Sequence, residues 1–361
     1  MYGYSEDGMK KKVTIQDIAD ALGISRNTVS KAINNSDGIA DATREMILQK
    51  AAEMGYKQFS YIKLVNAPQP APSFPSSADG GPTEIALFST IFLPNSHFAS
   101  LMLDKLQRDL SMLGYTLNNH RVTPEDRETM ALPITFRRER TAAIICVEMF
   151  DHRYDEMVCG LGLPTLFVDG PPKLGGRSLA ADQLYMENTG EGTRLVSDML
   201  RQGVRRIGFI GDYGHCQSFY ERYTAFRCAM LMAGVPVEER FIIRQSSRPV
   251  IEAKFMQLTE LPELFICAND FVAMDTLQVL EKMGLSVPSD VMLSGFDDAA
   301  ESRRSTPRLT TIHIHTQIMA FCAVQLLMTR IKEPSLDYRT VYTETELIYR
   351  ESTGTRKEGA V

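Results

Sequence analysis

Four residues near the N-terminus have the types and the spacing that read bases in DNA. They lie in the segment "VTIQDIADALGISRNTVSKAIN", residues 13–34, and at about 100° per residue they share an arc of about 140° of a helix. Arginine and lysine can donate to guanine, asparagine can pair with adenine, and hydroxyls can hold phosphates. An ordinary solvated helix face is the alternative. The four residues are Arg26, Asn27, Ser30 and Lys31.

The apolar pattern around these residues predicts three short helices. In the first, apolar residues recur at i, i+3, i+4 and i+7, and Thr14 with Asp17 caps its start. Gly23 breaks the pattern and Ser25 caps the second helix, which carries the four polar residues. A third helix follows within residues 42–56 and stops at Gly55. Two helices joined by a tight turn predict a helix-turn-helix, whose second helix enters the major groove.

This block resembles the headpiece of lactose- and galactose-repressor-type (LacI/GalR) transcription regulators. The family pattern V-T-[IL]-x-D-[IV]-A-x-x-x-G-[VI]-S-x-x-T-V-S-[RK]-x-[LI]-N is matched at nearly every fixed position, and "TREMILQKAAEMGY" continues it. Ala40 departs from it, because the family usually has serine there. The resemblance implies base reading by Arg26, Asn27 and Lys31. It also implies that five residues contact the DNA backbone or support the fold: Thr14, Ser25, Thr28, Ser30 and Asn34.

Charge is divided unevenly along the chain of 361 residues, whose net charge is −6. Residues 9–65 hold seven Lys and two Arg against six Asp and Glu, which is +3, and residues 1–8 add −2, so the remainder carries −7. A basic head on an acidic body confines affinity for polyanions to one end. The sequence leaves open whether Met1 or Met9 is the true start.

The rest of the composition is that of a soluble protein. No apolar run approaches the ~20 residues of a membrane span, and the N-terminus lacks a signal-peptide core. The six cysteines form no CxxC pair and lie mostly in apolar surroundings, which predicts reduced, buried thiols. We therefore expect a cytoplasmic protein without a membrane partner.

A linker separates the headpiece from the rest of the chain. Residues 66–82 hold five Pro and two Gly, which indicates extended chain. In the LacI/GalR family the residues after the headpiece form a hinge helix that enters the minor groove and wedges a leucine into a base step. Here Lys63 would supply the positive charge of the hinge helix, and Val65 or Leu64 would act as the wedge. Gln58 and Phe59 differ from the residues that the family has at these positions. Either the hinge helix forms only on DNA, the reading we favour, or it is degenerate.

From residue 83 onward, apolar runs alternate with helical stretches. The runs "EIALFST", "YTLNNHRV", "AAIICVE", "PTLFVDG", "RRIGFIGD", "ERFIIRQ", "ELFICAND" and "VMLSGFDD" predict strands of a parallel α/β fold in two lobes. Ligands collect at the carboxyl ends of strands in such sheets. Polar residues stand at those ends: Glu148, Asp169, Asp212, Asn269, Asp270, Asp297 and Asp298.

The body also resembles the LacI/GalR family, whose body is a periplasmic-binding-protein-like fold. The resemblance rests on "QGVRRIGFIG", "ERYTAFRCAMLMAGVPV", "CANDFVAMDTLQVLEKMGLSVPSDVMLSGFDD", "TPRLTTI" and "RESTG". It implies an effector site in which Arg222 binds hydroxyls or a carboxylate. Asn269 and Asp297 would bind from one lobe and Glu148 from the other, with Phe98 stacked on a ring. The alternative for each acidic residue is a strand-end turn or a helix cap, and Asn188 with Glu191 resembles a capping box.

No catalytic motif was found. The chain lacks GxSxG, HExxH and a Walker loop, and "GFIGDYG" lacks the G-x-G-x-x-G spacing. The pair "HIH" at residues 313–315 has no third metal ligand nearby, so we interpret it as a surface feature. Asp297 and Asp298 are consecutive and should point in opposite directions, which argues against a carboxylate pair. We expect no enzyme, no cofactor and no metal.

The sequence thus predicts a DNA-binding transcriptional repressor controlled by a small metabolite, most simply a sugar. We expect an N-terminal extension (1–12), a helix-turn-helix domain (13–57), a hinge and Pro-rich linker (58–82) and a two-lobed effector-binding and dimerisation body (83–361). A homodimer would bind an inverted-repeat operator in double-stranded DNA, and a tetramer is left open. The alternatives are an effector-independent dimeric regulator, a purine or nucleoside effector, and a sugar-processing enzyme with an appended head.

Overall fold

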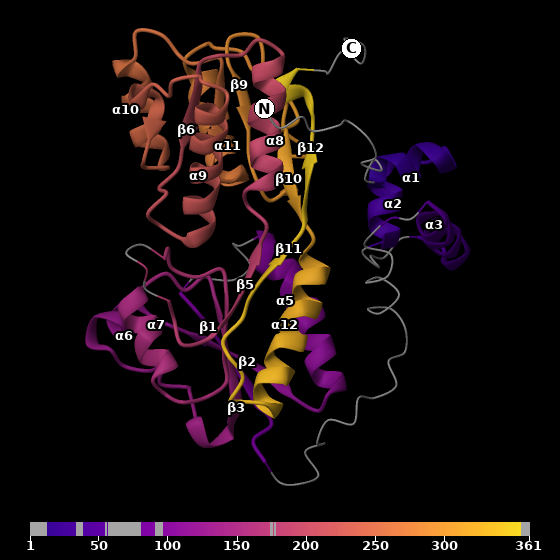
Figure 1. Cartoon of the computed structure of the whole chain (residues 1–361), viewed down its shortest axis with the longest axis vertical. Helices are drawn as coiled ribbons and strands as arrows, with labels where there is room; N and C mark the ends of the chain where they lie inside the picture. Colours follow the sequence, from indigo (N-terminus) through magenta and orange to yellow (C-terminus); the bar gives the residue numbers. More distant parts are fainter. Residues whose placement is uncertain are drawn as a thin grey trace, which may run out of the picture. The chain divides into compact units, whose positions relative to one another are not determined.

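The computed structural model divides the chain into two compact units, residues 1–74 and 75–361. It describes residues 13–33, 39–54, 56, 81–90, 97–173, 176 and 178–354. The first unit holds three helices, α1 (Ile15–Leu22), α2 (Arg26–Ile33) and α3 (Asp41–Glu53) (Figure 1). Their number and order confirm the three helices predicted from the apolar period.

Local capping and a small core explain why this unit forms. The Thr14 hydroxyl accepts a hydrogen bond from Asp17 N (3.2 Å), and the Asp17 carboxylate accepts one from Thr14 N (2.8 Å), so the predicted cap is a complete capping box. Gly23 ends α1 with φ 65°, a conformation that favours glycine. Fully buried side chains from all three helices then meet: Ile18, Ala19, Val29, Ala32, Ile47 and Ala51.

The first lobe of the body is built on a six-stranded parallel sheet of order β11-β5-β4-β3-β1-β2. Its strands are β1 (Glu84–Ser89), β2 (Thr116–Arg121), β3 (Thr141–Val147), β4 (Thr165–Val168), β5 (Asp182–Met186) and β11 (Thr340–Thr343). Its helices are α5 (His97–Met112), α6 (Pro124–Thr129), η3 (Arg138–Arg140), α7 (His152–Cys159) and α12 (Thr316–Lys332), and α5 packs against α12.

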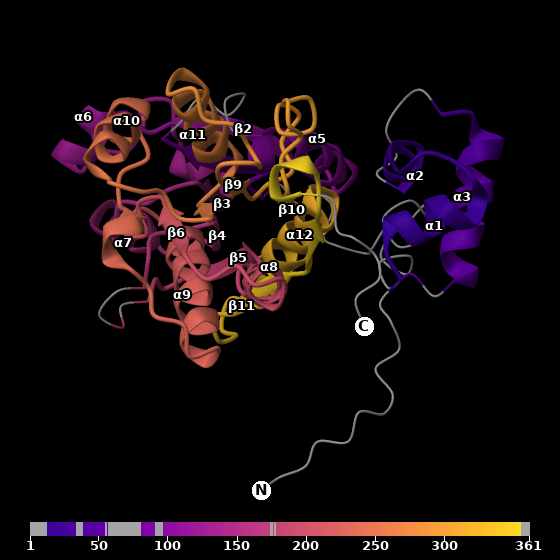
Figure 2. The same cartoon turned by 90° about the horizontal axis from the view of Figure 1, so that it is seen from above.

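The second lobe has a four-stranded parallel sheet of order β7-β6-β8-β9. Its strands are β6 (Ile207–Ile210), β7 (Ile242–Ile243), β8 (Leu264–Cys267) and β9 (Met292–Ser294). Its helices are α8 (Gly190–Arg201), α9 (Gln217–Met232), η5 (Glu239–Phe241), α10 (Arg248–Gln257) and α11 (Asp270–Lys282). Helix α8 packs on α9, and α10 packs on α11. Seen from above, helices flank the sheets on both sides (Figure 2).

The chain crosses between the lobes three times. The crossings join β5 to α8, β10 (Thr311–Ile314) to α12, and β11 to β12 (Thr345–Ile348), and η6 (Glu351–Thr353) follows. Strands β10 and β12 form a separate antiparallel ribbon. A helical headpiece followed by a two-lobed parallel α/β body confirms the predicted fold class.

All eight predicted strands are present, but four others were missed. Strands β5, β10, β11 and β12 carry buried polar residues such as Asp182, Thr311 and Thr345 in place of an apolar run. These strands lie at the crossings, where tertiary hydrogen bonds satisfy the polar side chains. Composition therefore conceals them.

The cysteines are only partly as predicted. All six are free, and Cys146, Cys216 and Cys267 are buried. Cys228, however, is exposed on α9, so the expectation of buried thiols is wrong at that position. Within the described residues, no helix is long and apolar enough to cross a membrane.

Candidate functional site

Helix α2 presents the predicted base-reading residues on its outer face. Asn27 and Lys31 are exposed, Arg26 and Ser30 are half-buried, and Val29 packs inward. The structure therefore places the four polar side chains away from the core, as a recognition helix requires.

The predicted supporting residues are engaged in caps. The Ser25 hydroxyl accepts a hydrogen bond from Thr28 N (3.1 Å), and the two hydroxyls lie 2.8 Å apart. Thr14 holds the start of α1 in its capping box. Both helix starts leave backbone N–H groups that suit a phosphate. The predicted contacts Asn34, Lys63 and Val65 lie outside the described residues.

The body has its candidate site where strands of the two lobes end. Glu148, Asp169 and Asp297 follow β3, β4 and β9, with φ of 52°, 51° and 111°. Among the non-glycine residues described, only Asp298 and Met130 share a positive φ. Left-handed backbone at non-glycine residues is strained and concentrates at functional sites. The strained carboxylates therefore mark the facing edges of the two sheets as the candidate effector cleft.

Arg222 is the cation at the centre of this cleft. It is buried on α9, and its Nε donates to Asn188 Oδ1 (3.0 Å) while its NH1 donates to the Ala268 carbonyl (2.8 Å). The same NH1 lies 3.8 Å from Asp297 Oδ1, and the guanidinium carbon lies 3.5 Å from the centre of the Phe296 ring. Arg222 thus ties the first crossing of the chain to the ends of β8 and β9.

Burial and the nearby charges act in opposite directions on Asp297. Burial is the largest cause and raises the pKa of its carboxyl well above the usual range, whereas Arg222 lowers it. Asp270, Glu148 and Asp169 raise the pKa further, because their negative charges lie within electrostatic reach. Glu148, Asp297 and Arg222, predicted from three separate segments, are therefore brought together.

Asn188 is the organising residue at the first crossing, and the capping-box interpretation of it is wrong. Its side-chain amide donates to the Met186 carbonyl (2.9 Å) and to Glu221 Oε2 (2.8 Å), and its oxygen accepts from Arg222. The start of α8 is instead held by Glu187, whose carboxylate accepts from Thr189 N and Gly190 N, both at 2.8 Å. The Asn188 amide can be buried because both its nitrogen and its oxygen have hydrogen-bond partners at this crossing.

Asp169 and Ser218 form a hydrogen bond between the lobes. The Ser218 hydroxyl donates to Asp169 Oδ1 at 2.8 Å, from α9 of one lobe to the end of β4 of the other. Burial raises the pKa of Asp169 to about 6, although Ser218 and Arg222 lower it. Asp169 had appeared only among the strand-end residues, and nothing in the sequence around Ser218 indicated the contact.

Asn269 and Asp270 hold the second lobe together. Asn269 Oδ1 accepts from Val272 N (3.0 Å), so its side chain caps α11, the alternative considered from the sequence. Asp270 is buried and accepts from the Thr311 hydroxyl (2.6 Å) and Ala299 N (2.8 Å). A Cβ at Gly295 would clash with Asp270 Oδ1, so only glycine fits there. Asn269 still lies beside the Ala268 carbonyl that Arg222 holds.

Asp298 points away from the cleft, as predicted for consecutive residues. Its carboxylate accepts from His313 Nδ1 (3.0 Å) and from Arg350, and it pairs with Arg303 (3.2 Å). Burial raises the pKa of Asp298, but His313, Arg350 and Arg303 together hold it below its usual range. The interpretation of "HIH" as a surface feature is wrong, because His315 is buried and His313 is nearly so.

One aromatic contact joins the two lobes beside the cleft. Phe150, after β3, meets His215 of the second lobe with ring centroids 4.7 Å apart. Phe98 belongs to α5, but its side chain is outside what the structure describes.

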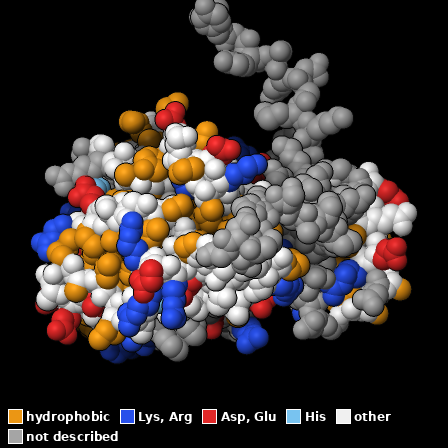
Figure 3. Space-filling view, turned by 90° about the horizontal axis from the view of Figure 1, so that it is seen from below, with side chains coloured by type: hydrophobic (Ala, Val, Ile, Leu, Met, Phe, Trp, Pro, Cys, Tyr) orange, Lys and Arg blue, Asp and Glu red, His pale blue; other side chains and the backbone are white. Residues whose placement is uncertain are grey.

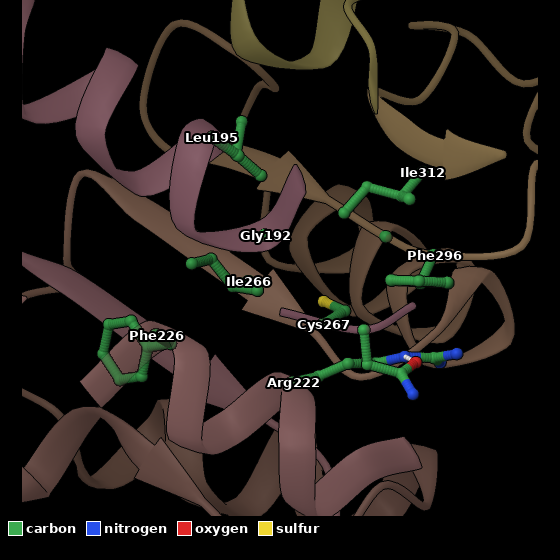
Figure 4. Close-up of a pocket in the computed structure, with 10 residues that line it drawn as sticks. Gly192, Leu195, Arg222, Phe226, Ile266, Cys267, Phe296 and Ile312 are labelled. Atoms are coloured by element: carbon green, nitrogen blue, oxygen red, sulfur yellow. Dashed lines mark hydrogen bonds between the residues drawn. The ribbon is translucent and has the colours of Figure 1, made fainter. Parts of the chain in front are cut away.

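A mainly apolar pocket lies beside Arg222. It is lined by α8, α9, β8 and the segment around Phe296, and the Arg222 guanidinium lies against the Phe296 ring (Figure 4). In the described part of the chain, no group of three His, Cys, Asp or Glu residues could hold a metal.

Comparison with known proteins gives two family matches. Residues 14–58 match the model for bacterial regulatory proteins of the lacI family, and residues 196–353 match a periplasmic binding protein-like domain. The chain is 23% identical over 346 residues to the HTH-type transcriptional repressor PurR of Photobacterium profundum, covering 94% of this chain and 98% of that one. It is 26% identical over 350 residues to PurR of Actinobacillus pleuropneumoniae serotype 3, with the same coverage.

Two solved structures share the fold over almost the whole chain. The transcriptional regulator CelR–cellobiose complex aligns with a TM-score of 0.67 and 22% identity, covering 94% of this chain and 99% of that one. The lac repressor dimer bound to operator and the anti-inducer ONPF aligns with a TM-score of 0.61 and 19% identity, covering 96% and 100%. Headpiece, body and relatives agree: the chain consists of a lacI-family helix-turn-helix domain followed by a periplasmic binding protein-like domain, and it is a DNA-binding transcriptional regulator.

Proposed function

We propose that this regulator is a dimeric repressor whose affinity for an inverted-repeat operator is controlled by a neutral, hydroxyl-rich small molecule, most simply a sugar. The observation that carries the proposal is the set of contacts around Arg222. One side chain joins the first crossing of the chain, the end of β8 and the cleft carboxylate Asp297. A ligand that binds here would bias the angle between the lobes, and a ligand shifts an equilibrium only by its preference for one state.

The charges of the cleft favour a neutral ligand over an anionic one. Nε and NH1 of Arg222 already donate to Asn188 and Ala268. Glu148, Asp169 and Asp297 lie around that single cation, and the raised pKa of Asp297 shows that the site disfavours further negative charge. An incoming carboxylate or phosphate would meet these like charges in a partly desolvated site, which is costly. Ligand hydroxyls can instead donate to the carboxylates while a ring face lies on an aromatic side chain.

A ligand panel distinguishes these classes. We expect at least one neutral mono- or disaccharide to raise the melting temperature of the full-length protein by several degrees, because a ligand that binds only the folded state stabilises it by RT ln(1 + [L]/Kd). The uronic acid and the phosphate ester of the same sugar should raise it far less. The reverse ranking would contradict the charge argument, and the absence of any shift would favour an effector-independent regulator.

A purine or nucleoside is the second candidate effector, because the similar proteins found by comparison are PurR-type repressors. Purine N–H groups could also donate to the cleft carboxylates, and a purine ring could stack on an aromatic face. Purine bases and their nucleosides therefore belong in the same panel. A shift with these compounds alone would replace the sugar proposal.

The operator is tested by selecting bound sequences from random duplex DNA at a stated salt concentration. Enrichment of an inverted repeat would support two recognition helices related by dimer symmetry. A fixed central C–G step would support insertion of the hinge despite its departures at Gln58 and Phe59. Failure to enrich any sequence, with every compound of the ligand panel added, would overturn the proposal.

Arg26→Ala should relax base preference at one position of each half-site. An arginine that pairs with guanine contributes about 1–3 kcal/mol of discrimination, so affinity for the selected operator should fall roughly 5- to 100-fold. Repeating the selection with the variant measures the change. Gln16→Ala is the matched control, because Gln16 is exposed on α1 and bonds to Asp20 of the same helix. An unchanged sequence preference would show that Arg26 contacts only the backbone or nothing.

A further inference from the structure

One loop of the first lobe exposes three arginines that have no acidic partner among the described residues. The loop is residues 137–140, with Arg137, Arg138 and Arg140 all exposed, and it is called the arginine loop below. In the part of the chain that the structure describes, no ion pair joins any of them to an acidic side chain. Arg240 and Arg308, two other exposed arginines of the body, are paired with glutamates, whereas Arg153 and Arg304 are exposed without such an ion pair among the described residues but do not share one short loop.

Side-chain hydrogen bonds to backbone carbonyls hold the loop in place. Arg137 NH1 donates to the carbonyls of Ile134 (2.7 Å) and Phe136 (2.8 Å), and the Thr141 hydroxyl donates to the Arg137 carbonyl (2.8 Å). Arg138 NH1 donates to the Leu161 carbonyl. These bonds leave most guanidinium donors of Arg138 and Arg140 directed at solvent, since each guanidinium carries five N–H groups.

The arginine loop lies where the chain from the DNA-binding unit joins the body. It leads directly into β3, whose first residue Thr141 pairs with Glu84, the first residue of β1. The linker, residues 58–82, is joined to β1 at this same end of the sheet, and 25 residues span at most roughly 85 Å. Figure 3 views this end of the body, where Lys and Arg side chains stand among hydrophobic and acidic ones.

We infer that the arginine loop is a second DNA contact, which binds the phosphate backbone beside the operator without reading sequence. The inference rests on the proposed function. Arginine matches phosphate oxygens through paired N–H donors, and contacts to phosphate add affinity that falls with salt. The positive charge of the arginine loop and its position beside the end of the linker both favour DNA over an acidic protein surface as the partner.

This contact would give the effector a route to DNA that does not pass through the linker. Strand β3 runs from the arginine loop at one end to Glu148 in the cleft at the other. The loop therefore moves with the first lobe as one body. A rotation of that lobe around the three crossings changes where its arginines meet the duplex, so lobe closure alters affinity through this contact.

The test uses the full chain with the double variant Arg138→Gln/Arg140→Gln, leaving Arg137 to hold the loop. The matched control is Arg153→Gln/Arg304→Gln, which removes the same charge from two exposed arginines elsewhere on the body. Affinity is measured against salt on two duplexes, the selected operator alone and the same operator with about 15 base pairs added on each side, roughly one and a half helical turns.

On the long duplex, the loop variant should bind about 10-fold more weakly than the control at low salt. Its salt slope should be shallower by roughly 2 to 4, since two arginines are removed from each subunit of the proposed dimer and each phosphate contact contributes about 0.9. On the trimmed duplex, variant and control should agree. Equal affinities and slopes on both duplexes would overturn the inference and point to an acidic protein surface as the partner. If the wild-type protein selects no sequence at all, it is the proposed function that fails.

Discussion

Replacing Arg222 with alanine is expected to abolish the response to effector and to lower the stability of the body while sparing DNA binding. The substitution leaves Asn188 Oδ1 and the Ala268 carbonyl without their donor, and it removes the cation that lies 3.8 Å from Asp297 Oδ1. Each buried polar group left unpaired costs about 1–3 kcal/mol, so the loss should be several kcal/mol. The headpiece is a separate unit with its own core, so operator binding should persist.

Thermal unfolding with and without the ligand, together with operator titration, measures all three effects. Arg227→Ala is the matched control, because Arg227 lies on the same helix but is partly exposed and pairs with Glu239. Arg222→Lys keeps the charge without the planar fork, so it should fold better than the alanine variant and still bind ligand at least 100-fold more weakly, about 2.7 kcal/mol. Wild-type ligand affinity in Arg222→Lys would remove Arg222 from the effector site.

Replacing Asp155 with asparagine is expected to stabilise the protein at neutral and alkaline pH. Asp155 lies on α7 with none of its surface exposed, and neither carboxyl oxygen has a hydrogen-bond partner in the described structure. Burial, with Asp151 nearby, raises its pKa from 3.8 to about 8, while Arg127 lowers it. An isosteric amide cannot ionise, so it avoids placing a charge among apolar side chains.

The sign of the pH dependence follows from the raised pKa. Between pH 4 and pH 8 the folded state holds a proton on Asp155 that the unfolded state has released, so the free energy of unfolding falls as pH rises. The stability is fully present below about pH 4 and is lost as the pH approaches 8. At about 1.4 kcal/mol per pKa unit, the upper limit is on the order of 5 kcal/mol. Asp155→Asn should remove this slope.

Urea unfolding from pH 5 to pH 9 checks the prediction, with Glu156→Gln as control because Glu156 is exposed on the same helix. Asp169 and Asp270, whose pKa values burial raises to about 6, contribute a slope that both variants share. A variant Asp155→Asn that is less stable than wild type at pH 8 would mean that the ionised carboxylate has a compensating partner.

The headpiece could be predicted from the sequence almost completely, because its determinants are local. The capping box joins Thr14 to Asp17, the second cap joins Ser25 to Thr28, and Gly23 takes the positive φ that ends α1. Contacts three or four residues apart leave a period in the sequence. The polar arc of α2 is visible for the same reason, since it is what remains after the apolar positions face the core.

The sequence predicted the fold class of the body but not the arrangement of the residues in its candidate effector cleft. Its central strands are apolar runs buried on both faces, which composition reveals. The crossings are polar and join residues far apart, such as Arg222 with Ala268, Asp169 with Ser218, and Asp298 with Arg350. No periodicity records such pairs, so the resemblance could supply Arg222 and Asp297 but the role of Asn188 was misread.

The sequence by itself therefore determined the three-helix headpiece and the parallel α/β class of the body, because helix periods, caps and apolar strands are properties of neighbouring residues. Only the tertiary structure decided which polar residues share the cleft, which ones cap helices and which are buried in ion pairs. Asn269 caps α11, Asp298 turns to His313, and Asp297 faces Arg222. These roles depend on the partner that folding places opposite each side chain, and the partner is distant in sequence.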